Sequence, residues 1–291
     1  MALHPQARAA LDADGGVPPW DPAFDIDAER AAAREAALAL PREPVDRVED
    51  VDADGVRCRL YVPDGADALI VHLHGGGFVF HDIDVHDAVA RRLANRSGMA
   101  VLSVDYRRPP EHRFPAAPDD VDTVLDWLGE QDLPKPLFVH GDSAGGNLAL
   151  VAALRNPGRF AAVALTYPFL DPTAGFDSWH TDGEGFAPEE AAWYWQQYAA
   201  TDADLIDPDL APLLSDRLGT LAPTLVLTAE HDPLRDEGEE LARLLAEAGV
   251  EVVATRYLGQ LHGFWRHVDV FDVAEPATRQ IAAWFRQHAD G

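Results

Sequence analysis

A regular alternation of short apolar runs with helical patterns constrains the fold of this chain more than any other feature. Seven runs rich in Val, Ile, Leu and aromatic residues are predicted strands, at 56–62, 68–74, 99–106, 137–140, 162–168, 224–230 and 250–257. Five helical patterns follow such runs, at 86–97, 119–131, 144–154, 236–249 and 275–289. The inner runs are almost continuously apolar, as in a parallel sheet covered by helices on both faces. The pattern predicts a doubly wound α/β fold.

Two segments depart from this alternation. Residues 1–45 contain two alanine-rich helical patterns before the first predicted strand. Residues 171–212 separate two predicted strands, and such a length is unusual for a connection in a compact domain. Long excursions of this kind are usually lids or binding loops.

The charge and cysteine content exclude several classes of protein. Fifty acidic and 23 basic residues give a net charge of −27, which repels nucleic acid and anionic membrane surfaces. Cys58 is the single cysteine, so no intrachain disulfide can form. The N-terminus lacks the pattern of a secretory signal, and no apolar run approaches the ~20 residues that span a bilayer. We expect a cytoplasmic protein with a small-molecule partner, without nucleic-acid or membrane partners; a homodimer stays open.

One strand-to-helix junction carries a chemical motif. Gly141-Asp142-Ser143-Ala144-Gly145 matches G-x-S-x-G, in which a sharp turn projects the serine hydroxyl and glycines let strand and helix approach. A helix N-cap is the plain alternative for Ser143. The N–H of Ala144, at the start of the helix, points toward negative charge that forms beside Ser143.

A nucleophilic serine needs a base, and the base needs an acid. His262 follows the strand predicted at 250–257, and Asp232 follows the strand predicted at 224–230. Asp232 can also be read as a helix N-cap, and Asp236 is a second candidate for the acid. The order Ser143, Asp232, His262 is that of α/β-hydrolases.

The segment HGGGF at 74–78 follows a third predicted strand at the same edge of the sheet. Glycines allow backbone N–H groups to approach an oxyanion closely. A flexible turn is the simpler reading of consecutive glycines.

Taken together, HGGGF, DYRRPPEHRFPAAPDD (105–120), GDSAGGN (141–147), AEHDPLRDEG (229–238) and HGF (262–264) resemble the hormone-sensitive-lipase-like family of bacterial carboxylesterases. The resemblance implies an α/β-hydrolase core over 46–291 and a helical cap. The cap comprises residues 1–45 and an insertion at about 171–212.

The same resemblance implies hydrolysis of carboxylic esters without a cofactor or metal. It makes Ser143 the nucleophile, His262 the base and Asp232 the acid. It assigns the oxyanion hole to Gly75, Gly76, Gly77 and Ala144, with the N–H groups of the last three as donors and Gly75 shaping the turn. Residues 105–120 are expected to brace this loop. His81 departs from the family, which more often has glycine there.

Aromatic residues in the second half of the insertion, Trp193, Tyr194, Trp195 and Tyr198, are expected to pack within the cap, with one or two lining the pocket. We expect Phe78 and Trp193 to contact the substrate. His72, His74, His81 and His86 could suggest a metal site, but no carboxylate or cysteine falls at ligand spacing in the sequence, and we predict no metal.

The predicted function is a carboxylesterase for short acyl chains, acetyl to hexanoyl. A deacetylase or amidase dedicated to one metabolite would use the same triad. A non-catalytic receptor of this fold is a weaker alternative, because His262 is present.

Overall fold

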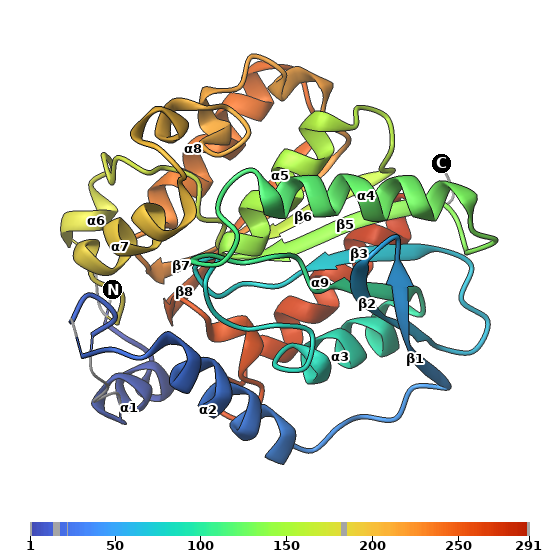
Figure 1. Cartoon of the computed structure of the whole chain (residues 1–291), viewed down its shortest axis with the longest axis horizontal. Coiled ribbons are helices and arrows are strands. Elements are labelled where there is room, and N and C mark those ends of the chain that lie inside the picture. The colour runs from blue at the N-terminus through green and yellow to red at the C-terminus, as the bar shows by residue number, and fades with distance from the viewer. Residues whose placement is uncertain (1, 14–17, 22, 182–184, 290–291) are drawn as a thin grey trace.

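The computed structural model describes residues 2–13, 18–21, 23–181 and 185–289, which form an eight-stranded sheet between two layers of helices (Figure 1). The strands are β1 Arg47–Ala53, β2 Val56–Val62, β3 Leu69–Leu73, β4 Ala100–Val104, β5 Leu137–Asp142, β6 Ala162–Thr166, β7 Thr224–His231 and β8 Val252–Leu261. Their order across the sheet is β1-β2-β4-β3-β5-β6-β7-β8. From β4 to β8 the neighbours are parallel, and β2 is antiparallel to β1 and β4. The predicted fold class is confirmed.

Helices cover both faces of the sheet. The helices are α1 Pro5–Ala13, α2 Ile26–Ala39, α3 Asp87–Ser97, α4 Ala116–Glu130, α5 Ala144–Arg155, α6 Ser178–Thr181, α7 Pro188–Tyr198, α8 Arg235–Glu247 and α9 Ala274–Gln287. Figure 1 shows α4, α5 and α8 on one side of the sheet and α3 and α9 on the other. Val124 and Leu148 belong to the buried cluster of the first layer, and Leu93 and Phe285 to that of the second. Burial on both faces explains why the inner strands are almost continuously apolar.

The first strand was not among the seven predicted ones. β1 reads RVEDVDA and is mostly exposed at the edge of the sheet, so it lacks an apolar run. Its one local signal is the Asp54-Gly55 pair, whose φ values of 53° and 94° suit the tight turn of a two-residue hairpin. A largely exposed edge strand therefore cannot be recognised from a run of apolar residues.

The two segments outside the alternation lie together at one end of the molecule. Figure 1 shows α1 and α2, from residues 1–45, near α6 and α7, from residues 171–212, beside the ends of β7 and β8. Residues from both segments line the same cavity as Ser143 and His262. We propose on this basis that the two segments form a cap.

Candidate active site

Ser143 lies in the turn between β5 and α5, with φ 56° and ψ −123°. A non-glycine residue in this region of positive φ is strained, and such strain persists only where the surroundings enforce it. A Cβ on Gly141 would collide with the backbone of Gly145, and one on Gly145 would collide with the backbone of Leu73. The two glycines therefore permit the close approach of strand and helix that holds the serine in place.

The structure brings the three predicted triad residues together. His262 Nε2 is 2.9 Å from Ser143 Oγ, and His262 Nδ1 is 2.8 Å from Asp232 Oδ2. The Asp232 side chain is fully buried, whereas the His262 side chain is 20% exposed. The three residues follow β7, β8 and β5 at the carboxyl edge of the sheet. The arrangement can remove the serine proton and stabilise the imidazolium that results.

The alternative acid has other partners. Asp236 accepts a hydrogen bond from the Ser178 N–H and pairs with Arg235. Asp232 uses its second oxygen to accept the Leu234 N–H at 2.8 Å, which leaves Oδ2 for His262. The geometry therefore favours Asp232 over Asp236 as the proposed acid.

Three backbone N–H groups of the glycine loop and of the turn after Ser143 are candidate oxyanion donors. The N–H groups of Gly76, Gly77 and Ala144 have no hydrogen-bond partner within the described residues. Gly75 differs, because its N–H donates to Asp142 Oδ1 at 3.0 Å. We therefore propose Gly76, Gly77 and Ala144 as the oxyanion donors and assign Gly75 the role of anchoring the loop.

Several contacts fix the loop that carries these donors. Tyr106 Oη donates to the His74 carbonyl at 2.7 Å, from the segment expected to brace the loop. Arg30 on α2 donates to the carbonyls of Val79 at 2.9 Å and Pro109 at 2.6 Å. Helix α2 thus connects the glycine loop to residues 105–120. Such contacts hold the loop in place before substrate binds, as an oxyanion hole requires.

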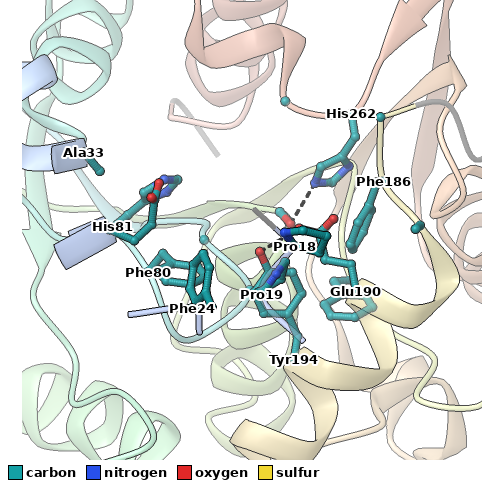
Figure 2. Close-up of a pocket in the computed structure, with 18 of the residues that line it drawn as sticks. Pro18, Pro19, Phe24, Ala33, Phe80, His81, Phe186, Glu190, Tyr194 and His262 are labelled. Atoms are coloured by element: carbon teal, nitrogen blue, oxygen red, sulfur yellow. Dashed lines mark hydrogen bonds between the residues drawn. The ribbon is translucent and has the colours of Figure 1, made fainter. Parts of the chain in front are cut away.

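A cavity of about 1000 Å³ opens beside the triad. Figure 2 shows Phe186, Glu190 and Tyr194 on one side of it, Phe24 and Phe80 opposite, and His262 above. Aromatic rings therefore form part of the cavity wall, as is common in ligand pockets.

The two residues predicted to contact substrate lie elsewhere. Phe78 is fully buried and stacks on Tyr198, with ring centroids 3.8 Å apart, and it is not part of the cavity wall. Trp193 stacks behind Phe80 at 6.0 Å and also does not line the cavity. Tyr194, its neighbour on α7, does line it. The structure therefore places Phe78 in the core and Trp193 behind the cavity wall.

Other lining residues were not singled out in the sequence. Tyr167 follows β6 at φ 37°, and its ring lies 4.7 Å from the His262 ring. The Phe186 ring lies 5.2 Å from the same ring. Tyr167 ends a predicted strand and could have been suspected, since strand ends meet at the site. Phe186 gave no such signal.

A group of buried histidines lies behind the glycine loop. His140 bonds Thr166 Oγ1 at 3.1 Å and His72 Nδ1 at 3.0 Å, and His72 Nε2 is 3.4 Å from His86 Nδ1. Burial lowers the pKa of His72 to about 3 and also lowers those of His86 and His140. We therefore describe this group as a chain of neutral imidazoles.

Asp142 lies near these histidines, which the spacing of residues in the sequence did not predict. His72, His86 and Asp142 offer ligand atoms within 4.8 Å of one another. Asp142 Oδ1 already accepts the Gly75 N–H, and both nitrogens of His72 face other imidazoles. We explain the cluster by these hydrogen bonds, and the absence of a metal stays a prediction.

Chelation tests that prediction. Prolonged dialysis against EDTA should leave ester hydrolysis within about twofold of the untreated protein, because no proposed step uses the cluster as a metal site. Activity and bound metal would be measured on the same samples. A loss of activity that added Zn²⁺ or Fe²⁺ restores would contradict it.

Acid should destabilise the protein through the buried histidines. His72, His74, His86 and His140 have pKa values lowered by burial, so the unfolded chain takes up protons below about pH 6.5 that the native state refuses. The stability that these neutral histidines contribute to the fold is fully present above that pH and is lost as pH falls toward about 3.

Carboxyls whose pKa is raised by burial oppose this loss. Burial raises the pKa of Asp142 to about 6 and raises that of Glu237, so the native state gains protons there as pH falls. His81 and His267 add to the group of histidines with lowered pKa values, and Asp105 adds to the carboxyls with raised ones, so the histidines remain the more numerous. Urea unfolding should therefore show a net loss of stability as pH falls from 6 to 5. His140→Gln should flatten the slope, whereas exposed His112→Gln should not. Equal stability at both pH values would contradict this account.

Comparison with known proteins agrees with this geometry. A family profile described as alpha/beta hydrolase fold matches residues 70–266. Carboxylic ester hydrolase LipN of Mycobacterium tuberculosis is 37% identical over 91% of this chain and 77% of its own length. An ethyl acetate hydrolase of Pseudomonas putida is 34% identical over 99% of this chain and 100% of its own. The structure of a hyperthermophilic esterase from Pyrobaculum calidifontis superposes with a TM-score of 0.89 at 37% identity, covering 97% of each chain.

Among the described helices, none is both long and apolar enough to cross a membrane.

Proposed function

The chain belongs to the hormone-sensitive-lipase-like group of the α/β-hydrolase family and is a carboxylic ester hydrolase, and we propose that it cleaves short-chain esters through an acyl-enzyme on Ser143. The observation that carries the triad proposal is the pair of hydrogen bonds that joins Ser143 Oγ, His262 and Asp232.

The proposed reaction begins with the imidazole tautomer. With Nδ1–H donating to Asp232, the lone pair of His262 Nε2 faces the Ser143 hydroxyl. Ser143 Oγ attacks the ester carbonyl as its proton moves to Nε2, and the oxyanion receives hydrogen bonds from Gly76, Gly77 and Ala144. His262 then protonates the departing alkoxide. A water molecule, deprotonated by His262, attacks the acyl-enzyme and releases the acid.

The cavity walls support a preference for short acyl groups. Phe186 and Tyr194 close one side of the space above Ser143, while α2 and Phe24 close another. Each methylene that enters an apolar pocket gains about 0.8 kcal/mol until it meets a wall. The strong negative charge further disfavours adsorption at anionic lipid surfaces, so we propose dissolved esters in the cytoplasm as substrates.

Chain length should therefore decide activity. On p-nitrophenyl esters, kcat/KM should rise from acetyl to a maximum no longer than hexanoyl and then fall, and emulsified triglyceride should be a poor substrate. Phe186→Ala removes a wall and should shift the maximum to longer chains. Leu214→Ala, at an exposed position outside the cavity, is the matched control. Higher kcat/KM on long chains in the native enzyme, or activation at an interface, would contradict the proposal.

A further inference from the structure

One cationic side chain lines the cavity close to the triad. Arg266 ends the short helix η4, Phe264–Arg266, that follows His262, and its half-buried side chain faces the same cavity as Ser143. It is the single arginine or lysine in the described wall of that cavity. A strongly acidic chain thus places a guanidinium in the same cavity as its proposed nucleophile.

The partners of Arg266 are neutral rings. Its Nη1 lies 3.2 Å from His81 Nδ1 and 3.4 Å from His81 Nε2, and its Nη2 lies 3.3 Å from His267 Nε2. Burial and the charge of Arg266 lower the pKa of both imidazoles, that of His267 to about 4. Neutral imidazoles can accept hydrogen bonds, but they do not neutralise the guanidinium.

Arg266 differs in this from the arginines that form ion pairs with carboxylates. Arg155, for example, contacts the carboxylates of Asp119, Asp122 and Asp209. Among the described residues, no carboxylate lies within 4.0 Å of the Arg266 guanidinium. Among the described residues, therefore, no carboxylate in direct contact neutralises its charge, although at longer range that charge opposes the rise in pKa that burial causes at Asp142.

The acidic side chains of the cavity wall have hydrogen-bond partners other than Arg266 or are exposed to solvent. Asp25 caps α2, Glu190 accepts the Tyr194 hydroxyl at 2.9 Å, and Asp142 accepts the Gly75 N–H. Glu29 is exposed on α2 and repels an approaching anion. Ionic strength screens such exposed charges within about 8 Å, whereas a direct contact inside the cavity is screened much less.

His81 explains how the guanidinium is held. Its Nδ1 is 3.2 Å from the Gly75 carbonyl oxygen and 3.2 Å from Arg266 Nη1, and its Nε2 is 3.4 Å from the same Nη1, so the ring lies between the guanidinium and the loop. The residue adopts φ 64°, at the position where the family more often has glycine. This departure links Arg266 to the glycine loop. A guanidinium has five N–H donors, and the two imidazoles engage two of them, so three remain.

We propose that the preferred substrates are esters bearing a carboxylate, which binds the free donors of Arg266 while Ser143 attacks the ester group. Such esters are half-esters of dicarboxylic acids or acyl esters of hydroxy acids. The inference rests on the proposed ester hydrolysis at Ser143. Planar, paired N–H donors match a carboxylate in geometry as well as in charge.

Isosteric pairs of esters test the proposal. Monoethyl glutarate would be compared with its neutral amide, ethyl 4-carbamoylbutanoate, and the butyrate ester of glycolate with the corresponding glycolamide. At least one charged ester should exceed its amide about tenfold or more in kcat/KM, and Arg266→Gln should lower that ratio about 10- to 100-fold. Arg266→Lys should retain part of the ratio, and exposed Arg243→Gln should leave it unchanged.

An inhibition experiment on the native enzyme avoids dependence on folding of the variants. Glutarate should compete with p-nitrophenyl butyrate, and glutaramide should compete about tenfold less well. The proposal would be overturned if the ratio of kcat/KM between charged ester and amide were near one for both pairs and unchanged in Arg266→Gln. Equal inhibition by glutarate and glutaramide would also overturn it. Failure to cleave any ester would instead overturn the proposed function.

Discussion

Ser143→Ala should reduce kcat on a short-chain ester by about 10⁴-fold or more, because the variant lacks the hydroxyl that we propose forms the acyl-enzyme. Ser143 Oγ is the group that His262 Nε2 faces at 2.9 Å. The donors of the glycine loop persist in the variant, so a residual rate above that of water is expected. The melting temperature should change little, since alanine keeps the backbone and removes one hydroxyl. Both values would be measured on the same preparation.

Ser215→Ala is the matched control for this substitution. Ser215 is also buried, and its hydroxyl accepts the Arg217 N–H away from the cavity wall. Its loss should leave kcat within about twofold while it tests the general cost of removing a buried serine hydroxyl. An active Ser143→Ala enzyme would remove Ser143 from the role of nucleophile.

Asp232→Asn should lower kcat by roughly 10⁴-fold with the fold intact. An amide in place of the carboxylate can donate to His262 Nδ1, which favours the tautomer whose Nε2 carries the proton and cannot act as base. It also removes the negative charge that stabilises the imidazolium. Steady-state kinetics and a circular dichroism spectrum would separate this effect from misfolding.

Asp236→Asn controls for the loss of an acid at the start of α8. Its carboxylate accepts the Ser178 N–H and pairs with Arg235, so the substitution should lower the melting temperature and leave kcat within about threefold. If Asp236→Asn lost turnover and Asp232→Asn kept it, the acid would be Asp236.

The triad could be predicted from the sequence because its geometry depends on topology. Ser143, Asp232 and His262 each follow a run that is apolar or β-rich, and parallel strands bring their carboxyl ends to one edge. The position of Asp142, the residue before Ser143, could not be predicted in this way. Its contact with Gly75 depends on how the end of β5 and the glycine loop approach each other, which no pattern in either segment encodes.

The cavity wall could not be predicted, because it depends on side-chain direction in irregular backbone. Phe78 follows the glycines, yet φ 65° turns it toward Tyr198 in the core. Trp193 and Tyr194 are adjacent on α7, and only Tyr194 reaches the cavity. On a helix, neighbouring residues face about 100° apart, so an aromatic run identifies the helix and not the ring that meets the substrate.

Covalent labelling tests the central claim, that Ser143 forms the acyl-enzyme, most directly. A fluorophosphonate transfers its phosphorus to an activated serine oxygen with loss of fluoride, so labelling reports the nucleophile itself. Mass spectrometry of the labelled, digested protein should find one adduct per chain, on the peptide that contains Ser143, and Ser143→Ala should carry none. The rate of ester hydrolysis should fall in proportion to the fraction of chains that carry the adduct. An adduct on another serine, or full inhibition without an adduct on Ser143, would contradict the claim.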